Sequence, residues 1–246
     1  MNAPITLPNT SRNIFFDTWC EIILPLPSIL KQADDLEETF SSDPITNVAV
    51  IKSLLNSISE IEHDINIWRE SVIATIPAPI EYAHPPVPPA TGEDVLENIG
   101  TQYDILFPNP LEFASIEVAV LHLLYWTIQL LIHSTKNQLL KHSPSEAHSK
   151  QLLDDKSSLF TSLICRSVHY CFSDASALST EELLLPLYIS VDYFTRTGDE
   201  EKMRWGIKLF AKLERERGFK MGVQVRKVRE GKWGVTSIGL SKVEAG

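Results

Sequence analysis

Glycine, cysteine and alternating strand patterns are scarce in this chain. Its 246 residues include ten glycines, most of them in the last fifty residues, and none forms a GxGxxG or P-loop phosphate-binding motif. Nucleophile elbows and HExxH zinc spacings do not occur either. The three cysteines, Cys20, Cys165 and Cys171, lack the spacing of a disulfide framework. Together with an N-terminus that does not resemble a signal peptide, they predict an intracellular protein.

The apolar residues instead follow helical spacing, in a chain with 43% hydrophobic residues. We predict the all-α class, as a single helical domain of about eight to ten helices with a short β-hairpin near its C-terminus. The expected parts are N-terminal helices over 1–76, a Pro-rich connection over 77–110, a helical core over 111–222 and a tail with the hairpin over 223–246. We expect these parts to form one globular unit.

The N-terminal region predicts two helices separated by a break at Pro25 and Pro27, because proline interrupts a helix. A long amphipathic helix follows from Asp43-Pro44 to about residue 76, with Lys52, Glu60 and Glu62 facing solvent. Further along, we predict helices over about 146–172 and 200–217, and a helix that starts from a capping box at Ser179 and is kinked or restarted at Pro186.

The segment 111–140 is the centre of the predicted fold. Apolar residues fill nearly every position from 116 to 132, which predicts a helix that its neighbours cover on almost all sides. A membrane span would need about 20 consecutive apolar residues. Because the apolar run is shorter and contains His122 and Gln129, we favour a buried core helix and no membrane contact.

The polar residues of this helix lie along one seam. At 100° per residue, His122, Gln129 and His133 fall within about 40° of one another, with Trp126 beside them. A lone buried histidine is more often a satisfied hydrogen-bonding group than a metal ligand or a base. We therefore predict no catalytic or metal-binding residue here, and take His122, Trp126, Gln129 and His133 as candidates for a ligand pocket.

One acidic segment indicates an alternative function. Asp34-Asp35-Leu36-Glu37-Glu38 resembles the aspartate-rich motif of all-α prenyl-chain enzymes, in which paired carboxylates hold Mg²⁺ against a diphosphate. Such enzymes need a second metal-binding set, and Asp154-Asp155 lacks the acid that would complete one. We therefore keep a Mg²⁺-dependent prenyl-diphosphate enzyme as the alternative, and expect no cofactor in the main hypothesis.

Charge is distributed unevenly along the chain, whose formal net charge is -10. The region 202–232 contains eleven Lys or Arg residues and only three acids. Such a basic surface favours an acidic partner, which is either another protein or nucleic acid bound weakly and without sequence preference. The predicted surface consists of Lys208, Lys212, Arg215 and Arg217 on a helix, and Arg226, Lys227, Arg229 and Lys232 in the hairpin.

Three segments together resemble the fungal-specific transcription factor domain, the regulatory region of binuclear zinc-cluster transcription factors. They are Leu111-Glu112-Phe113 with Leu124-Tyr125-Trp126; Ile164-Cys165-Arg166-Ser167-Val168 with Tyr170; and 183–187 with Tyr193-Phe194, Gly198-Asp199, Trp205 and Gly218-Phe219. The resemblance spans about 106–221, and the six-cysteine zinc cluster does not occur in this sequence. It implies a non-enzymatic regulator in the nucleus that acts through protein contacts, including self-association, and senses a small molecule.

Overall fold

The computed structural model describes residues 9–39, 44–81, 105–141, 147–173 and 177–217. Helices account for 86% of these residues, and the only strands among them form one pair of two-residue strands. The predicted all-α class is therefore confirmed. The hairpin expected within 223–246 lies outside the described residues, as does most of the predicted Pro-rich connection.

The N-terminal helices are α1 (Asn9–Ile23), α2 (Leu26–Thr39) and α3 (Pro44–Ser71). The predicted break at Pro25 is confirmed, but the break at Pro27 is wrong. Pro27 lies in the first turn of α2, where a missing backbone N–H interrupts no helical hydrogen bond. The α-helix α3 ends earlier than predicted, and a 3-10 turn, η1 (Ile73–Thr75), continues the chain.

A short strand pair precedes the central helix. β1 (Ile80–Glu81) lies antiparallel to β2 (Leu111–Glu112), with Ile80 opposite Glu112 and Glu81 opposite Leu111. Residues 111–112 are therefore extended, and the central helix α5 (Ile116–Leu140) starts later than the apolar segment does. Its N-cap is Ser115, whose side-chain oxygen accepts a hydrogen bond of 3.4 Å from the backbone N–H of Val118.

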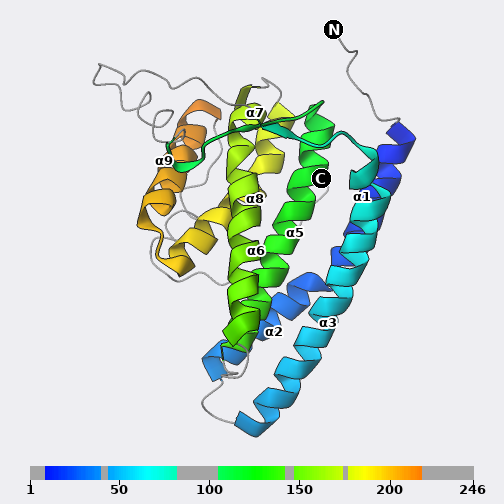
Figure 1. The fold of residues 1–246 in the computed structure, drawn as a ribbon, viewed down its shortest axis with the longest axis vertical. Coiled ribbons are helices and arrows are strands. Elements are labelled where there is room, and N and C mark those ends of the chain that lie inside the picture. The colour runs from blue at the N-terminus through cyan, green and yellow to red at the C-terminus, as the bar shows by residue number, and fades with distance from the viewer. Residues whose placement is uncertain (1–8, 40–43, 82–104, 142–146, 174–176, 218–246) are drawn as a thin grey trace, which may run out of the picture.

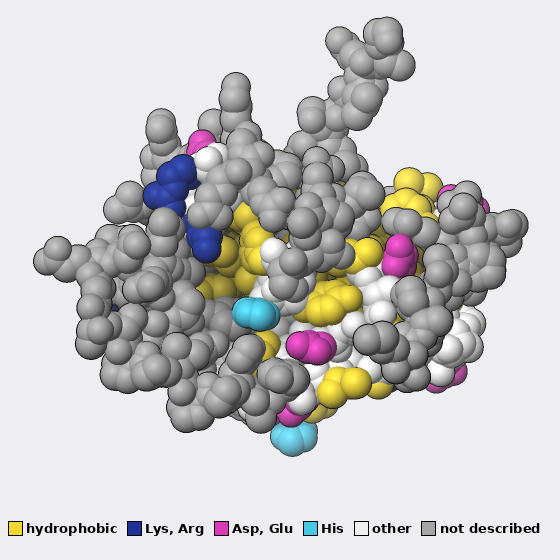
Figure 2. Space-filling model, turned by 90° about the horizontal axis from the view of Figure 1, so that it is seen from above, with side chains coloured by type: hydrophobic (Ala, Val, Ile, Leu, Met, Phe, Trp, Pro, Cys, Tyr) yellow, Lys and Arg dark blue, Asp and Glu magenta, His cyan; other side chains and the backbone are white. Residues whose placement is uncertain are grey.

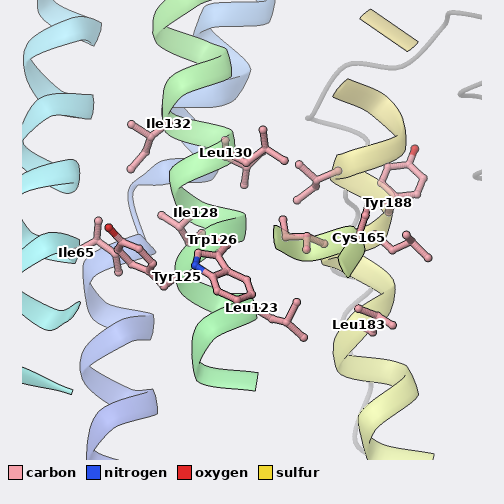
Figure 3. Close-up of a cluster of buried hydrophobic side chains, with 14 of the residues drawn as sticks. Ile65, Leu123, Tyr125, Trp126, Ile128, Leu130, Ile132, Cys165, Leu183 and Tyr188 are labelled. Carbon is pink, nitrogen blue, oxygen red and sulfur yellow. The ribbon is translucent and has the colours of Figure 1, made fainter. Parts of the chain in front are cut away.

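The helix α5 lies at the centre of the molecule (Figure 1). It packs against α2 and α3 on one side and against α6 (Ala147–Arg166) and α8 (Ala177–Thr197) on the other. Figure 3 shows its side chains leaving in both directions, with Tyr125 directed toward Ile65 of α3, and Leu123 and Leu130 directed toward α8. Sixteen of its 25 residues are buried, which confirms the predicted core helix.

Within the described residues, α5 is the one helix long and apolar enough to cross a membrane. The other parts of the protein bury 78% of its most apolar window. Its apolar side chains are therefore already covered by protein, as a core helix requires.

The C-terminal helices depart from the predictions at Ser167. The helix expected over 146–172 is divided there into α6 and α7 (Val168–Ser173). The hydroxyl of Ser167 donates to the carbonyl oxygen of Leu163 at 2.8 Å, a local bond that competes with the regular helix ladder. The helix α8 begins at Ala177, before the predicted capping box, and continues through Pro186.

The last described helix, α9 (Glu200–Arg217), has the predicted bounds. Gly198 has a φ of 73°, which an L-residue rarely adopts and which ends α8. The carboxylate of Asp199 then caps α9 by accepting a hydrogen bond of 3.2 Å from the backbone N–H of Lys202. The buried residues of α8 and α9 belong to the same hydrophobic cluster as those of α3 and α5.

The two last helices approach closely where Gly206 faces Val191. A methyl group at position 206 would overlap Cγ2 of Val191. We expect Gly206→Ala to lower the free energy of unfolding by about 1–3 kcal/mol, because the overlap outweighs the roughly 1 kcal/mol gain in helix propensity. Urea unfolding measures this loss.

Val191→Ala provides the control for this clash. Alone it should cost about 1 kcal/mol by leaving a small cavity, but combined with Gly206→Ala it should restore stability. Additive losses in the double variant would contradict the proposed contact.

Candidate functional site

All four predicted pocket residues are buried on α5, but they face two different surroundings. His122, Trp126, Gln129 and His133 have exposed fractions of 6, 5, 2 and 2%. Gln129 and His133 are hydrogen-bonded to α3, whereas His122 and Trp126 line a groove. The predicted seam is therefore real as a line of buried residues, but only its N-terminal half borders open space.

The C-terminal half of the seam joins α5 to α3 through a set of hydrogen bonds that we call the polar ladder. Asn66 Oδ1 accepts hydrogen bonds from Tyr125 Oη at 3.1 Å and from Gln129 Nε2 at 3.0 Å. One helical turn earlier on α3, Glu62 binds His133 Nε2 at 3.0 Å and the ammonium group of Lys136. These bonds satisfy the side chains of Tyr125 and Gln129 and one ring nitrogen of His133, while His133 Nδ1 is buried without a partner.

The position of Glu62 differs from the prediction. Lys52 and Glu60 are exposed, as expected, but Glu62 faces α5 and its side chain is 21% exposed. The hydrogen bond from His133 and the neighbouring ammonium group of Lys136 lower the pKa of Glu62 to about 2, against the opposing effect of burial. Glu62 is therefore an ionised structural group that stabilises the contact between α3 and α5.

The N-terminal half of the seam borders a half-open cavity of about 680 Å³, which we call the His122 groove. Its walls come from the end of α3, the turn η1, the residues before β1, and the facing sides of α5 and α6. Apolar side chains make up most of this wall: Ile73, Ile76, Tyr125, Trp126, Leu159, Phe160 and Leu163. Its size is typical of sites for small organic ligands.

The groove lies at the end of the molecule where α3 ends and α5 begins (Figure 1). Figure 2 views the molecule from this end, where hydrophobic side chains are visible with polar and acidic side chains beside them.

His122 presents a buried polar atom without a hydrogen-bond partner to this site. One ring nitrogen is hydrogen-bonded to the backbone of Pro77, and the other, Nε2, is buried and has no hydrogen-bond partner. Proline has no N–H, so its carbonyl oxygen must accept the bond, and Nδ1 of His122 must donate it. Burial lowers the pKa of His122 to about 4, and Nε2 is consequently an unprotonated acceptor at neutral pH.

Aromatic rings fix the orientation of His122. Its ring centroid lies 5.2 Å from that of Trp126 and 5.9 Å from that of Phe113, the residue that follows β2. Phe113 also contacts Tyr170 of α7 edge-on at 5.2 Å. The imidazole therefore contacts two rings, Phe113 and Trp126, and Phe113 is in turn held by Tyr170, which restricts rotation of the imidazole toward another partner.

Arg69 supplies the positive charge at the edge of the groove. Its guanidinium carbon lies 5.5 Å from the centroid of the Tyr125 ring, and its charge contributes to the lowered pKa of His122. No described carboxylate lies within ion-pair distance of it. The groove thus combines an apolar wall, a buried acceptor and an exposed cation, a set suited to binding an organic molecule.

A second cavity, of about 410 Å³, lies beside Phe107 and Tyr193 and has a more polar wall. Its charged groups, Asp199 and Lys202, pair with each other at 2.8 Å. Because Asp199 already caps α9, this cavity has an evident structural explanation and is the weaker candidate.

The acidic segment of the alternative hypothesis contacts the C-terminal end of α5. Gln138 Nε2 donates to Glu37 Oε2 at 2.8 Å and to Asp34 Oδ1 at 3.3 Å, and Lys141 pairs with Glu37 at 3.1 Å. In the part of the chain that the structure describes, no group of three His, Cys, Asp or Glu side chains could hold a metal ion. The side chain of Glu38 lies outside the described residues. The observed contacts are those of helix packing and give the Mg²⁺ hypothesis no support.

The predicted basic surface is only partly described. Lys208 and Arg215 are exposed on α9 and Lys212 is half-buried, on the side away from the buried Phe210. The side chain of Arg217 lies outside the described residues, as do Arg226, Lys227, Arg229 and Lys232. The idea of an acidic partner for this surface stays a prediction.

Sequence reasoning missed the contribution of α3 to the site. Glu62, Asn66 and Arg69 are spaced as i, i+4 and i+7, so they form one polar line along the helix. The buried residues Ile65 and Trp68 flank this line. This line of polar residues beside buried ones was the available signal that α3 meets the polar seam of α5.

The polar ladder gives a stability prediction. Glu62→Ala should lower the free energy of unfolding by about 2 kcal/mol, because it leaves His133 and Lys136 without their partner in a mostly buried place. The exposed Glu60, also on α3, is the matched control, and Glu60→Ala should change stability by less than about 0.5 kcal/mol. Equal effects in urea unfolding would contradict a special role for Glu62.

A second prediction concerns pH. Between about pH 6.5 and pH 4 the unfolded chain protonates His122 while the folded protein does not, so stability should decrease as the pH falls through this window. The expected contribution is on the order of 3 kcal/mol. Glu62 adds a further loss only below its ordinary pKa of about 4.5, toward pH 2.

His122→Phe tests this assignment, because it keeps an aromatic ring and removes the titrating group. Its free energy of unfolding, measured by urea titration at several pH values, should fall less steeply than that of the wild type between pH 6.5 and pH 4. The exposed His148 serves as the control, and His148→Phe should leave the wild-type slope unchanged. A wild-type slope in His122→Phe would refute the assignment.

Comparison of the chain with protein-family models, with curated proteins and with solved structures found no match. The resemblance to the fungal-specific transcription factor domain consequently stays a prediction from the sequence.

Proposed function

We propose that this chain is a non-enzymatic regulatory domain of the fungal transcription-factor type, which binds a small molecule in the His122 groove and acts in the nucleus through protein contacts. One observation carries the receptor part of this proposal. A buried ring nitrogen of His122 has no hydrogen-bond partner in the protein, at the wall of a mainly apolar groove of about 680 Å³.

The energetic argument is that a buried acceptor without a partner costs about 1–3 kcal/mol. Proteins satisfy most such groups, and those left unsatisfied call for an explanation. A ligand that donates a hydrogen bond to Nε2 would remove this cost on binding. The bond to Pro77 and the surrounding rings already orient the imidazole, so little conformational entropy would be lost.

Protein contact is supported by the outer face of α6. Leu152 and Leu159 are 51% and 55% exposed and lie seven residues apart, on the same face of the helix. Leu159 also lines the groove. A partner bound along this face would therefore touch the edge of the groove, and ligand binding could change the affinity for that partner.

The residues behind the family resemblance are mostly packing residues. Trp205 is 1% exposed and contacts Phe107 at a centroid distance of 4.6 Å, and Leu183 is also 1% exposed. Such residues support a helical scaffold and supply no reacting group. This agrees with a regulatory role, in which function depends on surfaces and a pocket.

Thermal unfolding with a metabolite library tests the proposal. We expect at least one compound to raise the melting temperature of the wild type, because a ligand that binds only the folded state stabilises it. Ala78→Trp, which fills the groove from an exposed position on its wall, should abolish this shift. Ala211→Trp, on the exposed face of α9, is the matched control and should retain it.

The regulatory part is tested with the same variants. Each is fused to a heterologous DNA-binding domain, and reporter transcription is measured with and without the stabilising compound. The wild type and Ala211→Trp should change reporter output in a compound-dependent way, whereas Ala78→Trp should not respond. If a compound binds the groove without affecting transcription, the proposed ligand binding stands and the proposed regulatory role is refuted.

A further inference from the structure

We propose that the ligand of the His122 groove is an organic anion with a ring-containing apolar body, an anionic group at the mouth beside Arg69 and a hydroxyl or N–H group that donates to His122. This inference rests on the proposed receptor function and names the chemical class of its ligand. Three observations carry it independently.

The first is the state of Arg69. Among the described arginines, Arg166, Arg196 and Arg204 each pair with a carboxylate at 2.8–3.1 Å, whereas Arg69 and Arg215 pair with no described carboxylate, and of these two only Arg69 lines the groove. The guanidinium of Arg69 lies over the Tyr125 ring and forms no ion pair with a described acid. A carboxylate or sulfonate is the natural partner for an arginine held in this way.

The second is the direction of the hydrogen bond to His122. Because Nδ1 donates to the carbonyl oxygen of Pro77, Nε2 can only accept while the ring is neutral. A ligand must therefore offer a donor at this point. A carboxylate placed there would have no hydrogen to donate and would face an acceptor lone pair, so the anionic group belongs at Arg69 and the donor at His122.

The third is the shape and polarity of the wall. Tyr125 and Phe160 meet edge-on with centroids 6.0 Å apart, and Trp126 and Leu163 continue the apolar surface. Flat ring systems fit such a surface. The groove is half-open and Arg69 is exposed, so the anionic group can stay hydrated while the rings are buried.

Three related compounds separate these features. They are 6-hydroxy-2-naphthoate, its neutral methyl ester, and 2-naphthoate, which lacks the hydroxyl group. With wild-type protein in isothermal titration calorimetry, we expect the hydroxy acid to bind most tightly, and each analogue to bind about fivefold or more weakly. The preference for the acid over the ester should decrease with added salt, because the anion and Arg69 meet near solvent.

Variants assign each preference to a residue. Arg69→Gln should remove the preference for acid over ester and keep the preference for the hydroxyl group, whereas His122→Phe should do the reverse. Arg204→Gln removes the same charge from an exposed position on α9 and should change neither preference. Should His122→Phe fail to fold, the wild-type comparison and Arg69→Gln still decide the question.

Two results would overturn the inference. If the ester binds the wild type as tightly as the acid, the groove accepts neutral ligands, and the receptor function stands without this ligand class. If none of the three compounds binds the wild type, the ligand class is wrong, and the library screen with Ala78→Trp judges the receptor function separately.

Discussion

The burial of α5 is the constraint on which the rest of the structure depends. A helix that is apolar on almost every side must be covered on every side, and α2, α3, α6 and α8 provide this cover. The same burial takes polar side chains of α5 away from water, so they need partners inside the protein. The polar ladder is the consequence, because Glu62 and Asn66 of α3 supply those partners.

The His122 groove lies where the segment that covers α5 changes from the helix α3 to the turn η1. Along most of α5, the long helix α3 lies beside it and the ladder closes the space between them (Figure 1). Near His122, α3 reaches its end, and η1 with the residues leading to β1 forms the wall together with Arg69. A short turn fills less space than a helix, which leaves the mainly apolar His122 groove with the unpaired Nε2 of His122 at its wall. The polar ladder and the His122 groove therefore lie along the same contact between α3 and α5.

The arrangement also separates two uses of buried histidine. His133 lies in the ladder, where Glu62 accepts its hydrogen bond and the contact stabilises the fold. His122 lies eleven residues earlier on the same helix, where a backbone carbonyl fixes its tautomer and leaves the other nitrogen facing the groove. The difference is set by the neighbours and not by the residue type. The proposed receptor function would use both, the ladder as a rigid frame and His122 as an accessible polar group.

The sequence by itself determined the helical class, the buried central helix, the bounds of α9 and the polar seam, because helical periodicity is written in local residue spacing. Only the tertiary structure decided which neighbour each part of the seam meets. Periodicity gives angles around a helix's own axis, and it does not say that Glu62 faces α5 or that Arg69 lies over Tyr125. The strand pair and the break at Ser167 likewise depend on contacts distant in sequence or on a single hydroxyl. The apolar pattern of the sequence predicted that the seam of α5 is buried. That the N-terminal half of the seam borders a groove follows from the position at which α3 ends, which is a property of the tertiary structure.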